Sequence, residues 1–282
     1  MPEYYQHRSW NWLLIAALLV MISGCLPQGH SEYRKLPYLL QGATGDPEPA
    51  PSPALYLKSQ VIRQDSNWSG QVIIEGVVVV GRRATLTIEP GTSIRFKKID
   101  SDGDGTGDSE LRVLGGIIAE GTGDRPITFA SAEENPARRD WSYLMIYSSG
   151  RLNRLSFCEF RHGFSGLQVQ FSTASVKNCL FEDNNRENEH PYPYINIGLQ
   201  GNNSPTLRGN QIYGSGHEMS GGIAVWNACA GLFEDNMIEG CGYGILCYQF
   251  DANPTEEALC FQNLRNRELL PGRRAHGFRV PC

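Results

Sequence analysis

From about Val61 onward the chain alternates short β-branched and aliphatic runs with glycine and proline, and it shows no helical periodicity. Gln71–Val80 and Ala84–Ile88 are two such runs. Short apolar runs between turn residues are typical of β-strands. The pattern therefore predicts an all-β body, and the close spacing of its strands fits a sandwich, a barrel or a solenoid.

Internal repetition decides among these folds. Four segments share the template apolar-x-x-(Cys/Asn)-x-apolar, and their fourth positions are 21, 31 and 26 residues apart, which suits one solenoid coil per repeat. Equivalent residues of stacked coils lie about 4.8 Å apart, so apolar residues would fill the bore and Asn residues would form a hydrogen-bonded ladder. The fourth positions are Cys158, Cys179, Asn210 and Asn236, and the Gly-apolar pairs that follow begin at Gly166, Gly198, Gly222 and Gly244.

These repeats, together with Leu86–Thr92 and Gly115–Phe129, resemble the right-handed parallel β-helix proteins of the pectate-lyase-like superfamily. The resemblance implies a single-stranded right-handed parallel β-helix over residues 59–265, with residues 266–282 as a C-terminal cap or tail. Lyases, hydrolases, epimerases and non-catalytic proteins share these repeats, so the resemblance implies a fold and leaves the function open.

The first 24 residues have the layout of an export signal. Leu13–Ile22 is an apolar run of signal-peptide length, too short to span a bilayer comfortably. The following Ile22-Ser23-Gly24-Cys25 resembles the bacterial lipobox, which implies a mature chain that starts at Cys25 and carries acyl chains such as palmitate on it. Leu26 favours the outer membrane, because an Asp there would resemble an inner-membrane retention signal. Residues 25–58, rich in proline, are expected to be a lipidated, flexible linker.

Composition narrows the class of partner. The chain has 282 residues, 40% of them hydrophobic and 20% charged, so it can bury a core. Its net charge of −5 and scattered basic residues argue against a nucleic-acid partner. The expected partners are the membrane, through the lipid anchor, and a polysaccharide or an envelope protein.

A run of alternating carboxylates suggests a calcium site. Asp100, Asp102, Asp104 and Asp108 surround a Gly105 at the sixth position, as in loops that wrap oxygen ligands around a hard cation. The pattern resembles thrombospondin type 3 and dockerin-like loops, although Leu111 replaces the closing Glu of an EF-hand. We expect a structural calcium ion there, with a solvated acidic turn as the alternative.

A second candidate site follows from the repeats. The fourth positions of the template, Cys or Asn, form what we call the Cys/Asn column. If their side chains point inward, the residues three places later point outward and form a ligand-binding strip of Arg161, Glu182, Tyr213 and Glu239. Solvated turns are the alternative interpretation of this strip. Trp141, Trp226 and Tyr248 are further candidates for stacking on sugar, with core or turn positions as the alternative. Residues one place before the column add to the same strip: Phe157, Asn178, Gly209 and Asp235.

Eight cysteines are present, and lipidation of Cys25 leaves seven. In an exported protein this favours disulfides over metal sites, with an odd cysteine left over. Cys158 and Cys179 share one template position, so both are expected to be buried, either as neighbouring thiols or as a strained bridge.

The leading functional hypothesis is a non-catalytic cell-envelope lipoprotein whose β-helix binds a polysaccharide or a partner protein. The alternatives are a lyase, hydrolase or epimerase on a polysaccharide, and a structural component of an envelope complex. An enzyme requires convergent carboxylates with a basic residue, whereas a binding module requires an exposed aromatic strip without them.

Overall fold

The computed structural model describes residues 53–184, 194–201, 204–217, 220–226, 231–248, 260–262 and 265–267. The signal segment, Cys25, most of the linker, the loop around His190 and the C-terminal residues 268–282 lie outside these ranges. Contacts divide the chain after Pro49, and only the second unit is described below. Within the described residues there is no helix, and so none long and apolar enough to cross a membrane.

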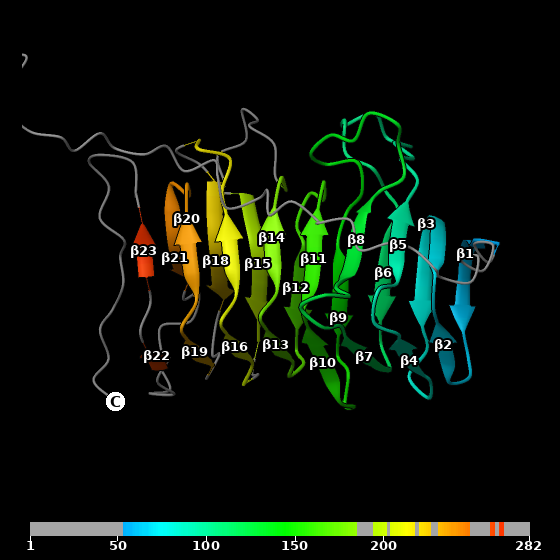
Figure 1. Ribbon diagram of the computed structural model, residues 1–282, viewed down its shortest axis with the longest axis horizontal. Helices are drawn as coiled ribbons and strands as arrows, with labels where there is room; N and C mark the ends of the chain where they lie inside the picture. Colours follow the sequence, from blue (N-terminus) through cyan, green and yellow to red (C-terminus); the bar gives the residue numbers. More distant parts are fainter. Residues whose placement is uncertain are drawn as a thin grey trace, which may run out of the picture. The chain divides into compact units, whose positions relative to one another are not determined.

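The described residues wind into a right-handed parallel β-helix with three faces (Figure 1). Face A comprises β1 (Leu55–Ile62), β3 (Gln71–Val80), β6 (Glu110–Val113), β9 (Leu144–Tyr147), β12 (Leu167–Gln170), β15 (Tyr194–Gln200), β18 (Ser220–Trp226) and β21 (Tyr243–Tyr248). Face B comprises β2 (Ser66–Trp68), β4 (Thr85–Ile88), β7 (Gly116–Glu120), β10 (Asn153–Ser156), β13 (Ser175–Lys177), β16 (Thr206–Arg208), β19 (Leu232–Glu234) and β22 (Cys260–Gln262). Face C comprises β5 (Ser93–Phe96), β8 (Ile127–Ser131), β11 (Cys158–Arg161), β14 (Leu180–Glu182), β17 (Gln211–Tyr213), β20 (Met237–Glu239) and β23 (Arg265–Arg267).

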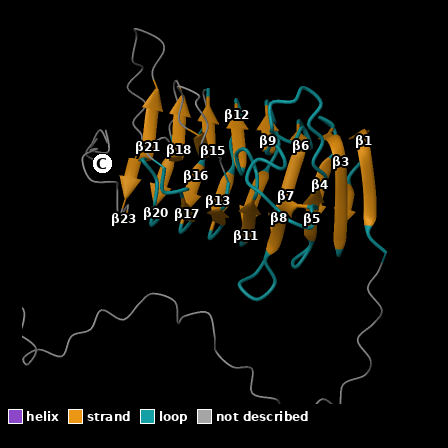
Figure 2. Cartoon of the chain, turned by 90° about the horizontal axis from the view of Figure 1, so that it is seen from above, coloured by secondary structure: helices purple, strands orange, loops and turns teal. Residues whose placement is uncertain are grey.

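Each coil runs from face A to face B to face C, and every strand pairs in parallel with its equivalents in the neighbouring coils (Figure 2). β3 belongs to two faces, because its first half pairs with β5 and its second half with β6. Gly76, with a φ of 85°, stands between the halves, and a Cβ there would lie 2.2 Å from Ser59 Oγ. Glycine is therefore needed for this bend.

The bore is filled by apolar columns, as the repeats predict. Phe129, Phe160 and Phe181 occupy one register position of face C, all fully buried. Their rings stack with centroids 4.7 Å apart and planes within 5° of parallel. The spacing of parallel strands, about 4.8 Å, imposes this separation, so the fold itself sets the ring geometry.

The predicted Asn ladder is also confirmed. Asn210 and Asn236 are fully buried. Asn210 Oδ1 accepts from Cys179 N at 3.0 Å, and Asn236 Oδ1 accepts from Asn210 Nδ2 at 2.8 Å. Their amides also donate to the backbone oxygens of Val176 and Leu207. The ladder thus satisfies polar backbone groups where the chain turns from face B to face C.

Two predictions need correction. The Gly-apolar pair at Gly198 is out of register by two residues, because Leu167 pairs with Ile197, which pairs with Ile223. Ile197 and Leu199 both face the bore, because side chains two residues apart lie on the same face of a strand. The alternation of apolar and polar residues therefore could not show which of the two pairs with Leu167. The expectation of disulfides is wrong for the cysteines that the structure describes with their side chains, since Cys158, Cys179 and Cys241 are free, buried thiols.

Candidate functional site

The structure brings the predicted strip of Arg161, Glu182, Tyr213 and Glu239 together at the ends of adjacent face C strands. Arg161 pairs in register with Glu182, and Tyr213 with Glu239. The Arg161 guanidinium forms an ion pair with Glu182 and lies 3.4 Å from Glu159 Oε2. One arginine thus contacts both carboxylates, and the role of the strip in ligand binding stays a prediction.

The residues expected to add to this strip lie elsewhere on the coil. Phe157, Asn178, Gly209 and Asp235 form the corner before the face C strands, whereas the strip forms after them. All four have φ between 47° and 65°, in the left-handed region. Their column is a turn position, which explains why it mixes residues without shared chemistry.

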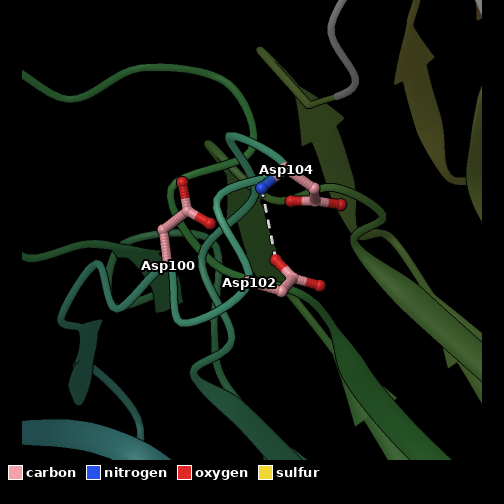
Figure 3. A group of neighbouring side chains, drawn as sticks. All are labelled: Asp100, Asp102 and Asp104. Atoms are coloured by element: carbon pink, nitrogen blue, oxygen red, sulfur yellow. Dashed lines mark hydrogen bonds between the residues drawn. The ribbon is translucent and has the colours of Figure 1, made fainter.

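The acidic loop lies between β5 and β6. Asp100, Asp102 and Asp104 each offer a carboxylate oxygen within 4.8 Å of the others, and all three are exposed (Figure 3). Backbone amides hold the loop: Asp100 Oδ2 accepts from Gly105 N, and Asp102 Oδ1 from Asp104 N. Asp108 Oδ2 accepts from Ser101 N at 2.8 Å. These oxygens are suitable ligands for calcium, with Asp100, Asp102 and Asp104 as the group that would hold it.

A buried arginine also contacts this loop. Arg139 is 4% exposed, and its guanidinium donates to Thr106 Oγ1 and lies 3.6 Å from Asp104 Oδ2. The hydrogen bond from the Thr106 amide, assisted by the Arg139 charge, lowers the pKa of Asp104. A cation bound at Asp104 would therefore compete with Arg139 for the same carboxylate.

Face A carries a row without charge, which we call the amide–aromatic row: Tyr147, Gln170, Gln200 and Trp226. These residues occupy one register position of β9, β12, β15 and β18, and the position continues to Tyr248 in β21. Each preceding residue faces the bore, for Ile146, Val169 and Leu199 are fully buried. The side chains of the row therefore point away from the bore, and the row itself runs parallel to the axis of the β-helix.

Amides and aromatic rings are suited to an uncharged, hydroxyl-rich ligand. Amides donate and accept hydrogen bonds, and Trp and Tyr offer an apolar face with a polar tip. At about 4.8 Å per coil, five register positions span about 19 Å. Of the aromatic residues expected to stack on sugar, Trp226 and Tyr248 occupy this register position, but Trp141 is fully buried and stacks on Phe96, so that part of the prediction is wrong. Gln170 and Gln200 were not predicted, because the Gly198 pair was placed two residues out of register.

Cys158 and Cys241 are poorly suited to act as nucleophiles. Burial raises the pKa of Cys241 to about 12, and burial beside Cys179 raises the pKa of Cys158. Protonated, buried thiols are inert towards substrates. Their role is to fill the bore.

Comparison with known proteins assigns the chain to a family. The family model for a right-handed β-helix region matches residues 115–260, more than half of the chain. No curated protein and no solved structure matches the chain. The family assignment agrees with the parallel pairing of every described strand with its neighbours. The chain belongs to the right-handed β-helix family.

Proposed function

We propose that this protein is a lipid-anchored binding module of the cell envelope whose face A holds an uncharged stretch of polysaccharide. The observation that carries the proposal is the amide–aromatic row, which repeats outward-facing amides and rings in register over four described strands. A polymer with a regular repeat is the kind of ligand that matches a regular row. A partner protein is the alternative occupant of the same face.

Charge on the two faces separates binding from cleavage. The positions of β9, β12 and β18 that alternate with the bore hold Met145, Tyr147, Gln168, Gln170, Ala224 and Trp226, with no carboxylate and no imidazole among them; Ala224 is fully buried. General acid–base chemistry needs a group whose pKa lies near the working pH. Glu110, at the start of β6 on face A, is a buried carboxylate paired with Arg112. Glu159 and Glu182, on face C, both contact Arg161. These features favour binding without turnover on face A.

Variants on the two faces test the assignment. Trp226→Ala and Gln200→Ala should each weaken retention on immobilised neutral glucans or galactans, measured by affinity electrophoresis. Loss of a stacking ring, worth about 0.5–1.5 kcal/mol, should cost about two- to twelvefold in affinity. Tyr213→Ala, on face C, is the matched control. If Tyr213→Ala abolishes retention while Trp226→Ala leaves it intact, the face A assignment is wrong.

The anchor rests on the lipobox-like Ile22–Cys25 and is tested separately. Wild-type protein should incorporate labelled fatty acid and sediment with membranes. Cys25→Ser removes the acceptor thiol, so this variant should lose the label. Incorporation of label that persists in Cys25→Ser would show that Cys25 is not the acylated residue and would contradict the lipobox assignment.

A further inference from the structure

One edge of the β-helix collects basic residues. The edge consists of the turns from face A to face B, residues 63–65, 81–84, 114–115, 148–152 and 171–174, and we call it the arginine edge. It carries four exposed arginines and one acid, Asp65, in a chain with a net charge of −5. The charge is therefore distributed unevenly, with its positive side on this edge. The four arginines are Arg63, Arg82, Arg83 and Arg151.

Two of these guanidiniums are held in place across a small turn. Arg82 Nη1 donates to Ser148 O at 3.2 Å, and Arg151 Nη1 donates to Thr85 Oγ1 at 3.2 Å. Both bonds bridge over the intervening coil, whose turn contains Gly115. A Cβ at Gly115 would lie 2.0 Å from Ala84 O, so this turn fits closely under its neighbour. Arg82 and Arg151 consequently reach across this turn and are each held by a hydrogen bond to a neighbouring coil.

Exposed apolar side chains lie on the same edge. Leu152 is 56% exposed and Phe171 49% exposed. Val61, in β1 just before this edge begins, is 44% exposed. Phe171 adopts a φ of 50°, a conformation that costs energy for a bulky side chain, and its ring meets Tyr147 edge-on at 5.9 Å. Large apolar groups held outward beside arginines are the composition of surfaces that enter a lipid interface.

We propose that the arginine edge rests on the anionic surface of a phospholipid membrane. The arginines would contact lipid phosphates, for which the planar guanidinium provides paired donors, and Leu152 and Phe171 would enter the headgroup layer. Charge complementarity is the argument for this partner. The proposal deepens the membrane attachment of the proposed function.

Vesicle binding of a chain without its anchor tests this proposal separately from lipidation. The mature chain, residues 25–282 with Cys25→Ser, should co-sediment with vesicles of phosphatidylcholine and phosphatidylglycerol, and not with phosphatidylcholine alone. Arg63→Gln with Arg83→Gln should reduce that affinity about 25-fold, at about fivefold per basic residue. Arg125→Gln with Lys177→Gln, at the corner between faces B and C, is the control with the same net charge. Equal binding to both vesicles, or an equal loss in the control pair, would overturn the proposal.

Two further arms separate a membrane from other partners. Phe171→Asn suits the left-handed backbone, so it should preserve the melting temperature while weakening vesicle binding severalfold. Unchanged vesicle binding by this variant would overturn the apolar part of the proposal. Inorganic phosphate should compete no better than chloride at the same ionic strength. Specific displacement by phosphate would assign the edge to a soluble phosphate compound and contradict the membrane proposal.

Discussion

Replacing Asn210 with alanine removes the centre of the internal ladder. Asn210 is fully buried, and its side chain accepts from Cys179 N at 3.0 Å and donates to Val176 O at 3.0 Å. It also donates to Asn236 Oδ1 at 2.8 Å, but that oxygen keeps a second donor in Asn210 N. Val176 lies in the parallel pairing of β13 with β16, so its carbonyl keeps a ladder partner. The substitution therefore deprives one backbone group, Cys179 N–H, of its buried partner.

The magnitude follows from the cost of burying polar groups without partners. One such group costs about 1–3 kcal/mol, so Asn210→Ala should lower the free energy of unfolding by about that amount. Cys, the residue found at the same position of two earlier coils, should be tolerated better than Ala, because its thiol fills more of the space. Gln211→Ala, exposed and next in sequence, should change stability by less than about 0.5 kcal/mol.

Urea unfolding followed by far-ultraviolet circular dichroism provides the measurement. Coils contact only their neighbours, so the loss should appear first as a lower midpoint for part of the signal. A change below about 1 kcal/mol for Asn210→Ala would refute the ladder as a source of stability. A similar loss in Gln211→Ala would attribute the effect to the strand and not to the ladder.

Chelation of calcium should lower the melting temperature of the mature chain, because calcium at a hundredfold excess over its dissociation constant stabilises the fold by about 2.7 kcal/mol. The double variant Asp102→Ala with Asp104→Ala should lose this sensitivity. Identical melting curves with calcium and with chelator would contradict a calcium site. Cys158→Asp should cost at least about 4 kcal/mol because it places a carboxylate in the bore, and Cys158→Ser clearly less, with equal losses as the contrary result. Burial raises the pKa of Glu110 above its ordinary value of 4.5, so the native state binds this proton more tightly than the unfolded chain and stability falls as the pH rises past 4.5. Glu110→Gln should accordingly raise the melting temperature at neutral pH and change it little below pH 4.5, and the reverse order would show that the charged form is the one favoured.

The fold could be predicted because a parallel β-helix repeats its own environment. Cys158, Cys179, Asn210 and Asn236 lie at one register position inside the bore, and the spacing of their template carries that information. The register at Gly198 could not be settled in this way. Strands alternate with a period of two, so a shift of two residues preserves every inward and outward position.

The candidate sites were harder to predict, because they depend on contacts between side chains of different coils and loops, which a repeat pattern does not specify. The strip that includes Arg161 was found from its spacing, but its ion pair with Glu182 depends on side-chain reach between coils. The contact between Arg139 and Asp104 joins two loops 35 residues apart in sequence. The arginine edge combines turns of different length, and no single motif marks it.

The most direct test of the central claim is to incubate the purified mature chain with neutral and acidic polysaccharides while measuring binding and cleavage in the same samples. Binding is followed by affinity electrophoresis, and cleavage by new reducing ends and by the ultraviolet absorbance of unsaturated products. The wild-type chain should be retained on a neutral polysaccharide, and this retention should depend on Trp226, while no new ends appear. New reducing or unsaturated ends that disappear in Glu182→Gln would contradict the proposed binding function and establish face C as a catalytic surface.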